Sequence, residues 1–577
     1  MEGGSHYSSS VEQATPPREA GGWRAVKFII GNESFEKLAS MGLQSNITVY
    51  LRSEYNMGSL LLVNVVNIWS GLTNFAPLAG AFLSDAYLGR FKTLLFGSFA
   101  TLLGMGTMTL TAGIHQLRPS ACRGRSDCQK PQKWQLGVLF AGLGLISAGA
   151  GGIRPCNIAF GADQFDTTTE EGKSQLNSFF NWWYFSFTVA LIIALTAVVY
   201  IQTDVSWVVG YAIPTVCLAL SILVFLLGTR TYIYVMPRGS VFIDIAKVII
   251  AALSKGRQVP SRSSELSFFD PPMNETSPPS SRLMRTDRFK FFDRAALITN
   301  PDELNGEGVP KNNWRLCSVQ QVEHLKCLVG VIPVWLSGIA CFLVMEQQNT
   351  CGLLQAIQMN KQIGSSFKVP SGWMGITSML ALSLCIFIYE CIYIPTVQKM
   401  ITRKPARFSI KQRVGAGIIM SILCMIVAGI VERKRRDSAL RHQAFESPMS
   451  IAYLLPQFML AGLTEALAAV AIMDFLTTQM PESMRTVAGA IFFLGLSIAS
   501  YLSSILVNVI HRLTMKNEKS PWLGGQDLNK NRLDYYYYII AGIGALNFIY
   551  FSFFASRYGL RTNVQHVSSE VQLENSE

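Results

Sequence analysis

Two carboxylates and an ammonium group lie close together near the start of the chain, in the stretch from Gly31 to Ser40. Glu33, Glu36 and Lys37 are spaced i, i+3 and i+4, so a helix would project all three side chains from one face. A neighbouring carboxylate disfavours ionisation and a neighbouring ammonium favours it, so such a cluster can be tuned to take up and release a proton. The triplet therefore predicts a proton-binding site.

The sequence on both sides of the triplet is apolar enough for a membrane helix, expected at about 28–51. Each ionisable residue inside a bilayer costs roughly 2.5–3.5 kcal/mol on insertion-based scales. A cluster of three therefore needs partners or a function. The alternative is a helix end that faces the cytosol and carries ordinary surface charges.

The composition is that of a membrane protein. Of the 577 residues, 50% are hydrophobic and only 15% are charged, and the mean hydropathy is +0.29. A soluble protein of this length carries more charge. The net charge of +12 does not indicate a nucleic-acid partner, because the basic residues lie in loops between apolar stretches, where membrane orientation explains them.

Apolar stretches of about 20 residues, the length needed to cross a bilayer, occur in two sets of six. A polar segment of about ninety residues separates the sets and is too long for an ordinary loop. This arrangement predicts two parallel repeats with a substrate site between them near the membrane midplane. The expected spans are about 28–51, 59–84, 92–114, 136–160, 178–201 and 205–229, followed by 325–349, 372–396, 410–431, 449–478, 485–511 and 535–556.

The pattern predicts an all-α membrane protein with both termini and the linker in the cytosol. Cations in the linker and after the eighth span favour this orientation, although Arg433-Lys-Arg-Arg436 would then face outward. Residues 241–255 have the apolar spacing of an amphipathic helix, either at the membrane interface or packed on the bundle. The expected parts are a disordered tail at 1–25, a six-helix bundle at 26–230, the linker at 231–320, a second six-helix bundle at 321–560 and a tail at 561–577.

The cysteines and histidines indicate no enzyme and no metal site. The six histidines occur singly, without metal-ligand spacing, and no nucleophile elbow is present. Most of the eleven cysteines fall in apolar runs, where cysteine is a small hydrophobe. Cys122 and Cys128 lie in a polar loop and could close a disulfide outside the cytosol.

A second group of charges follows the second span, in the segment from Gly80 to Lys92. Gly89 permits a tight turn there, and Asp85 can accept a hydrogen bond from Arg90 or from the start of the next helix. We expect these three residues to form a charge latch at an inner gate.

At this segment the chain resembles the major facilitator superfamily, and the spacing of its motifs is similar to that of the proton-dependent oligopeptide transporter family. The resemblance extends over about residues 22–560, and the third of the motifs given next is similar to the plant nitrate and peptide transporter branch. The motifs are Glu33-x-x-Glu36-Lys37, Phe179-Phe-Asn181-Trp-Trp-Tyr184, and Gly151-Gly-Ile-Arg154-Pro155 followed by Asp163-Gln-Phe-Asp166.

The resemblance implies a major facilitator fold of twelve transmembrane helices in two six-helix bundles, and it implies roles for particular residues. Glu33, Glu36 and Lys37 would couple transport to protons. Arg154 would be the basic residue of helix four and Glu465 the acidic residue of helix ten. Each would be a costly lone charge in its span, so we expect the two to pair across the cavity, either for coupling or simply to lock helices together.

Two departures from the family bear on the substrate. Peptide-transporting members continue the first motif with Tyr-Tyr-Gly-x-Arg, whereas this chain has Ser40-Met41-Gly42-Leu43-Gln44. The guanidinium that would clamp a peptide carboxylate is therefore missing, and di- and tripeptides are not expected. Met345 replaces the histidine of a dual-affinity nitrate carrier, which leaves low-affinity nitrate transport with Arg154 or Lys37 as the cation.

Other stretches are similar to the subfamily that holds low-affinity nitrate carriers and carriers of glucosinolates and other glycosides. These stretches are Gly21-Gly-Trp-Arg-Ala25, Asn67-Ile-Trp-Ser-Gly71, Trp314-Arg-Leu-Cys-Ser318 and Gly429-Ile-Val-Glu-Arg433. Glu346 could hydrogen-bond sugar hydroxyls or serve as an outer-gate contact. The candidate pocket residues are Gln44, Tyr184, Trp335, Met345 and Glu346.

The sequence as a whole predicts a symporter that imports a small anionic or polar solute, with low-affinity nitrate as the first expectation. The alternatives are import of a glucosinolate or other glycosylated metabolite, and a membrane sensor without net transport. We expect no cofactor, because a proton gradient supplies the driving force. The partners are the solute, the proton and the lipid bilayer of the plasma membrane or the vacuole.

Overall fold

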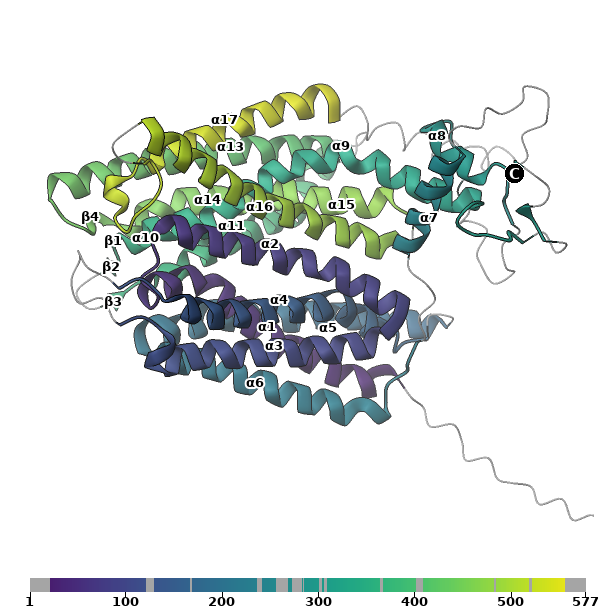
Figure 1. Cartoon of the computed structure of the whole chain (residues 1–577), viewed down its shortest axis with the longest axis horizontal. Helices are drawn as coiled ribbons and strands as arrows, with labels where there is room; N and C mark the ends of the chain where they lie inside the picture. The colour runs from purple at the N-terminus through teal and green to yellow at the C-terminus, as the bar shows by residue number, and fades with distance from the viewer. Residues whose placement is uncertain are drawn as a thin grey trace, which may run out of the picture.

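The computed structural model describes residues 21–120, 129–166, 169–235, 241–255, 268–271, 283, 285–299, 303–305, 309–363, 367–400, 408–481, 484–517 and 521–555. Long helices run nearly parallel along the molecule, with the two halves of the chain as two layers (Figure 1). The predicted all-α membrane architecture is confirmed. The proposed cysteine pair, Cys122 and Cys128, lies outside the described residues.

The first bundle consists of six long helices. Their observed starts and ends lie within a few residues of the expected spans, with two exceptions. The first helix begins six residues before 28, and the fifth begins and ends eight residues before 178 and 201. The helices are α1 (Gly22–Ser53), α2 (Ser59–Leu83, extended by a π turn at Ser84–Leu88), α3 (Arg90–Gly113), α4 (Lys133–Ala162), α5 (Glu170–Ile193) and α6 (Trp207–Leu227).

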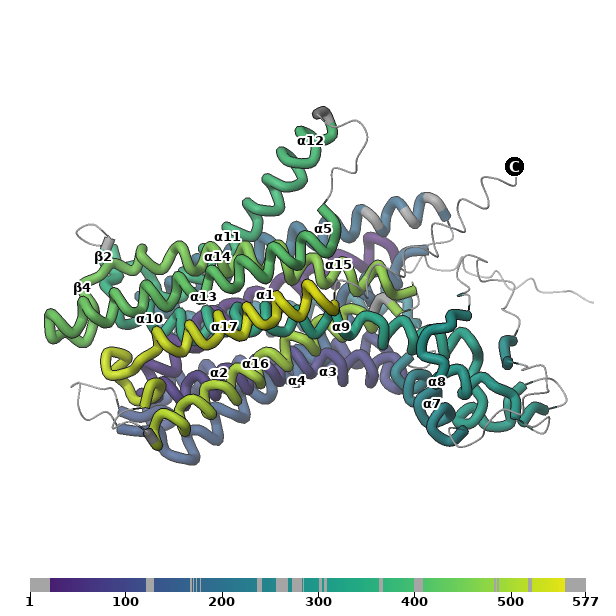
Figure 2. The backbone as a smooth tube through the Cα atoms, turned by 90° about the horizontal axis from the view of Figure 1, so that it is seen from above, coloured from purple at the N-terminus to yellow at the C-terminus, as the bar shows by residue number. Residues whose placement is uncertain are grey.

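The second bundle also has six spans, several of which are interrupted by π turns or short breaks. Its helices are α9 (Val319–Gln347) with α10 (Leu353–Ile357), α11 (Met374–Phe387) with α12 (Ile394–Met400), α13 (Ile410–Arg441), α14 (Leu455–Thr464) with α15 (Val470–Gln479), α16 (Arg485–Asn517) and α17 (Leu533–Tyr550). In Figure 2, α12 leans away from the body of the molecule.

Eleven helical segments of the described residues are long and apolar enough to cross a membrane. The twelfth, α1, fails this test of composition because it carries Glu33, Glu36 and Lys37. It nevertheless packs against α5 and α6 inside the first bundle. Its 32 residues span about 48 Å at 1.5 Å per residue, which is more than a bilayer core requires.

The two ends of the bundles differ. Helices α7 (Val241–Ser254) and α8 (Lys290–Asp293) lie at one end, called the linker side below. Four short strands lie at the opposite end, called the far side: β1 (Met359–Asn360) pairs in parallel with β4 (Ser447–Ser450), and β2 (Gln362–Ile363) pairs antiparallel with β3 (Phe367–Lys368) (Figure 1).

The linker helix α7 packs on the second bundle. Its buried Val248 and Ala252 join a small apolar cluster with Val322 of α9. Beside this cluster the Lys326 ammonium lies 2.6 Å from an Asp293 carboxylate oxygen. The other face of α7 is exposed and apolar, with Ile249, Ile250 and Leu253.

Glycines allow α2 and α4 to approach closely, and this approach positions the polar residues Asn74 and Arg154. A Cβ atom at Gly80 would overlap the Gly151 carbonyl oxygen, so the two backbones touch. This close approach brings Asn74 of α2 to Arg154, one turn beyond Gly151 on α4.

Candidate functional site

Three of the ionisable residues of α1, namely Glu33, Glu36 and Lys37, form one buried cluster. The Lys37 ammonium nitrogen lies 3.4 Å from Glu33 Oε1 and 3.2 Å from Glu36 Oε2. The exposed fractions of Glu33, Glu36 and Lys37 are 2%, 1% and 7%. Burial at this level excludes the alternative of a solvent-facing helix end.

Helix α4 supplies the other side of this cluster. Asn157 donates a hydrogen bond from Nδ2 to Glu33 Oε2. Arg154, one turn earlier, interacts electrostatically with Glu33 and Glu36 and donates a hydrogen bond to Asn74 Oδ1 over 3.0 Å. We call Glu33, Glu36, Lys37 and Arg154 the coupling cluster.

Aromatic rings cover both cations. The Lys37 ammonium lies 6.0 Å from the ring centroid of Phe187 on α5. The Arg154 guanidinium carbon lies 5.9 Å from the ring centroid of Phe493 on α16. Both distances allow a cation–π attraction. The contact between Arg154 and Phe493 links the coupling cluster to the second bundle.

Arg154 and Glu465 do not pair in this structure. Among the described residues the Glu465 side chain makes no ion pair and no hydrogen bond, while Arg154 donates to Asn74. Glu465 opens a π turn, Glu465–Ala469, that interrupts the helix between α14 and α15. Such turns are frequent at functional sites, and the pairing stays a prediction for another conformation.

Glu346 joins the two bundles. Ser70 of α2 donates a hydrogen bond to Glu346 Oε1 over 3.1 Å, and the Ser500 hydroxyl of α16 lies 3.3 Å from the Ser70 hydroxyl. The Glu346 side chain is buried, with 7% exposure. Its Oε1 oxygen is therefore committed to a contact between the two bundles, beside the middle of α2, and the outer-gate role considered from the sequence stays a prediction.

Sequence reasoning missed the polar ladder of which Ser70 is part. Asn67 donates to Ser503 over 2.7 Å, and Ser497 donates to the Gly71 carbonyl over 2.8 Å. Asn508 donates to Asn64 over 2.7 Å. Asn64, Asn67 and Ser70 recur every third residue in an apolar span, and this spacing is the signal that could have revealed a contact face.

The ladder starts at the middle of α2, with Ser70 and Gly71, and ends at Asn64 near the far-side end of that helix. The hydrogen bond from Thr48 of α1 to the Asn349 carbonyl, over 3.2 Å, belongs to the same end. The bundles are thus held against each other, from the far side to the middle of α2, by uncharged hydrogen bonds and one carboxylate.

The remaining pocket candidates are scattered. Trp335 donates its indole N–H to the Ile491 carbonyl over 2.9 Å and so packs α9 on α16. Met345 packs against the main core, whereas Gln44 is exposed and Tyr184 is 66% exposed. The structure does not bring these four residues to the coupling cluster.

In the charge latch after α2, Arg90 pairs with Asp163 and not with Asp85 as expected. Arg90 donates to both oxygens of Asp163, at the end of α4, over 2.5 Å. The expected Asp85–Arg90 hydrogen bond is not formed, because Asp163 takes the guanidinium, although Asp85 interacts electrostatically with both. Gly89 makes the predicted turn with φ of +77°, a conformation that favours glycine.

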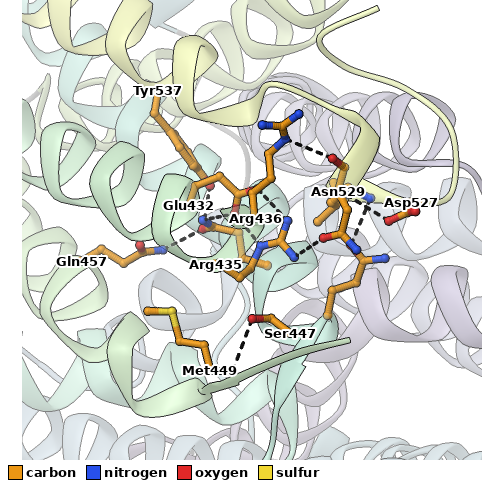
Figure 3. Close-up of polar contacts among 12 residues, drawn as sticks. Glu432, Arg435, Arg436, Ser447, Met449, Gln457, Asp527, Asn529 and Tyr537 are labelled. Carbon is orange, nitrogen blue, oxygen red and sulfur yellow. Dashed lines mark hydrogen bonds and ion pairs between the residues drawn. The ribbon is translucent and has the colours of Figure 1, made fainter. Parts of the chain in front are cut away.

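A second buried charge network lies in the second bundle (Figure 3). The Arg435 guanidinium binds the Glu432 carboxylate through Nε over 2.7 Å and Nη2 over 2.8 Å, and both side chains have no exposure. Arg435 also donates to Asn529 over 2.8 Å, and Gln355 donates to Glu432 over 2.9 Å.

This network explains the basic run that conflicted with the predicted orientation. Arg435 is a buried structural residue, and Arg436 donates to the Asn529 carbonyl over 3.0 Å. Two of the four charges in the run therefore hold the far-side loop after α16 and are not signals of membrane orientation. Among the described residues no group of three or more His, Cys, Asp or Glu side chains could hold a metal ion.

Comparisons with known proteins agree with this architecture. Residues 91–523 match the family model PTR2, described as the POT family. Protein NRT1/ PTR FAMILY 2.8 of Arabidopsis thaliana is 57% identical over 561 residues, which are 97% of this chain and 99% of that protein. Protein NRT1/ PTR FAMILY 2.13 of the same plant is 44% identical over 547 residues, 94% of this chain and 87% of the relative.

Solved structures share the fold. The POT family transporter PepTSo superposes with a TM-score of 0.66 at 17% identity, over 93% of this chain and 98% of its own. An auto-inhibited POT family peptide transporter gives a TM-score of 0.67 at 17% identity, over 93% and 97%. The predicted two-bundle fold is confirmed.

Proposed function

The chain belongs to the POT family of proton-coupled membrane transporters, and on that premise we propose that it is a symporter that imports a small anionic solute together with a proton. The observation that carries the proposal is the buried coupling cluster. Glu33 and Glu36 are held by Lys37 in low dielectric and face Arg154. Groups placed in this way are suited to gain and lose a proton during transport.

Charge balance links the proton to the solute. The two carboxylates and two cations of the coupling cluster sum to zero when all are ionised. Adding one proton to Glu33 or Glu36 leaves a buried net positive charge, which is unfavourable until an anion compensates it. Proton uptake therefore strengthens anion binding, and anion release on the other side favours loss of the proton.

Arg154 is the residue most available to that anion. Its hydrogen-bond partner, Asn74, is uncharged, and its guanidinium has further N–H donors. Glu346, the residue that could have hydrogen-bonded a sugar, is committed to Ser70. Both features favour nitrate as the solute. An anionic glycoside is the second candidate, because the Phe493 ring beside Arg154 offers a face for a sugar.

Glu465 acts in the same transport cycle on this proposal. In the present structure, in which the bundles are closed on the far side, Arg154 does not pair with Glu465. When the bundles close on the linker side instead, pairing with Glu465 would draw Arg154 away from the solute and promote release. On this proposal the linker side is the cytosolic side, Asp85, Gly89 and Arg90 belong to its gate, and the plasma membrane is the site of import.

A substrate panel in oocytes tests the proposal. Labelled nitrate and a glucosinolate are offered separately at acid and at neutral external pH, with Glu36→Gln and Arg154→Ala beside the wild type. Acid-stimulated nitrate accumulation that both variants lose is the expected result. Glu171→Gln is the matched control, because Glu171 is an exposed carboxylate at the start of α5.

Two other results would redirect the proposal. Acid-stimulated accumulation of the glucosinolate alone would make the anionic glycoside the substrate. A wild type at the cell surface that accumulates neither compound at any pH, yet changes a cellular response to nitrate, would indicate the sensor.

A further inference from the structure

Asn157 of α4 faces the proton-binding residues, and only one half of its side-chain amide is hydrogen-bonded among the described residues. Its side chain is buried, with 2% exposure. Nδ2 donates to Glu33 Oε2, whereas Oδ1 is buried without a hydrogen-bond partner among the described residues. A buried polar atom without a partner is costly, so its presence beside a titrating group calls for a reason.

We propose that Asn157 is a positioning residue that binds Glu33 in both of its protonation states, and this rests on the proposed coupling role of Glu33. With Glu33 ionised, the amide N–H donates to the carboxylate, as observed. With Glu33 protonated, a half-turn of the amide presents Oδ1 to accept the new O–H. The proton passes to Glu33 Oε2 from the transport pathway. The hydrogen bond from Nδ2 is exchanged for one accepted by Oδ1, and no other covalent bond forms or breaks.

The other groups that face Glu33 cannot serve both states. Lys37 and Arg154 only donate hydrogen bonds, and ionised Glu36 only accepts them. The neighbouring helices add uncharged groups: α5 adds Phe187 over Lys37, α2 adds Asn74 on Arg154, and α6 adds Ser221, which donates to Asn32. Asn157 alone among these offers Glu33 both a donor and an acceptor.

The amide also suits this role mechanically. Rotation about the terminal bond of an asparagine side chain is soft and nearly two-fold, so the half-turn needs no movement of the backbone. A hydrogen bond to an ionised group is stronger than one between neutral groups. Asn157 thus stabilises both states and favours the ionised one, which helps Glu33 to release its proton after each transport step.

The test replaces Asn157 by a residue of the same shape without polar atoms, Asn157→Leu. Losing the stronger bond to the ionised form should move the midpoint of the pH dependence of uptake toward higher pH, by about one unit. Asn157→Asp provides a second variant, because its carboxylate cannot donate and repels Glu33. It should move the midpoint further in the same direction.

Asn32→Leu is the matched control. Asn32 is an equally buried asparagine next to Glu33 in sequence, but it bonds Ser221 on α6 and not the coupling cluster. Initial uptake rates across external pH are normalised to the amount of protein at the surface. If Asn157→Leu fails to reach the surface, Asn157→Ser, which keeps a donor and acceptor, and Asn157→Asp are compared with each other.

The results separate the inference from the proposed function. An upward shift in the Asn157 variants, with an unshifted Asn32→Leu, supports the inference. Unshifted Asn157 variants in a protein whose wild type is acid-driven overturn the inference and leave the proposed function standing. A wild type that is indifferent to pH, or a Glu33→Gln variant with the normal pH profile, refutes the proposed coupling role and the inference with it.

Discussion

Ser70 of the first bundle donates a hydrogen bond to the buried Glu346 of the second bundle over 3.1 Å. The contact lies beside the middle of α2, next to the uncharged hydrogen bonds of the polar ladder. Alternating access requires such contacts to break once in each cycle. Hydrogen bonds between neutral groups contribute about 0.5–1.5 kcal/mol each, so a ladder of them can close the far side firmly and still open.

The first prediction concerns this closure. Ser70→Ala removes a donor from a buried carboxylate, which should weaken far-side closure by about 1–3 kcal/mol. Cysteines introduced at the hydrogen-bonded Asn64 and Asn508 report closure through their cross-linking. We expect less cross-linking in Ser70→Ala. The control is Thr107→Val, which removes a hydroxyl bonded to its own helix and should cross-link as the parent does. Equal cross-linking in Ser70→Ala and Thr107→Val would show that the Ser70–Glu346 hydrogen bond does not help to close the far side.

The second prediction concerns the buried pair of Glu432 and Arg435. Removing one partner of a buried ion pair leaves the other charge without compensation, at a cost of about 3–5 kcal/mol. Arg435→Ala should therefore lower the thermal unfolding temperature of the purified protein strongly. Arg433→Ala, two residues away on the exposed face of α13, should leave it nearly unchanged. Similar unfolding temperatures for the two variants would show that the pair is not structural.

The third prediction concerns the linker. Burial of Glu303 alone would raise the pKa of its carboxyl, but hydrogen bonds from Thr299 and Lys255 outweigh burial and lower this pKa below its ordinary value of 4.5. A lowered folded-state pKa contributes stability that is present above the unfolded-state value and is lost as pH falls through the folded-state value. The contact between Lys255 and Glu303 should thus hold at neutral pH and release in acid.

Hydrogen exchange of α7 measures this contact. Exchange in the wild type should increase as the pH falls below about 4.5, after correction for intrinsic exchange rates. In Glu303→Gln it should be faster at neutral pH and should change less in acid. A wild type whose α7 protection is constant across this range would contradict the prediction.

The fourth prediction concerns the linker-side latch. Arg90→Ala removes the partner of Asp163 at the end of α4. The pair is partly exposed, so we expect a loss of stability of only about 1 kcal/mol or less, together with a larger loss of transport. Exchanging the two charges, Arg90→Asp with Asp163→Arg, should restore part of the uptake. Equal uptake by the single and exchanged variants would show that the contact has no role in gating.

The helices could be predicted from the sequence because their signal is local. The span expected at 59–84 corresponds to α2 at Ser59–Leu83, and the one expected at 410–431 begins where α13 begins. Helix α13 continues to Arg441, past the buried pair of Glu432 and Arg435. Hydropathy ended the span too early, since it does not register charges that are paired.

Contacts between distant segments could not be predicted in the same way. Arg90 has Asp85 close in sequence, but the packing of α3 on α4 brings Asp163 to it instead. Asn157 carried no signal, because an asparagine in a span has no fixed partner until the rotation of both helices is known. The i, i+3, i+4 spacing placed Glu33, Glu36 and Lys37 together correctly, because all three lie on one helix.

The most direct test of the account uses proteoliposomes with an inward proton gradient and labelled nitrate outside. The wild type should accumulate nitrate above equilibrium and should lose this accumulation when the gradient is collapsed. Glu36→Gln should still exchange nitrate across the membrane but should not accumulate it. Accumulation by Glu36→Gln at the wild-type level would contradict the central claim that the buried carboxylates of α1 couple transport to protons.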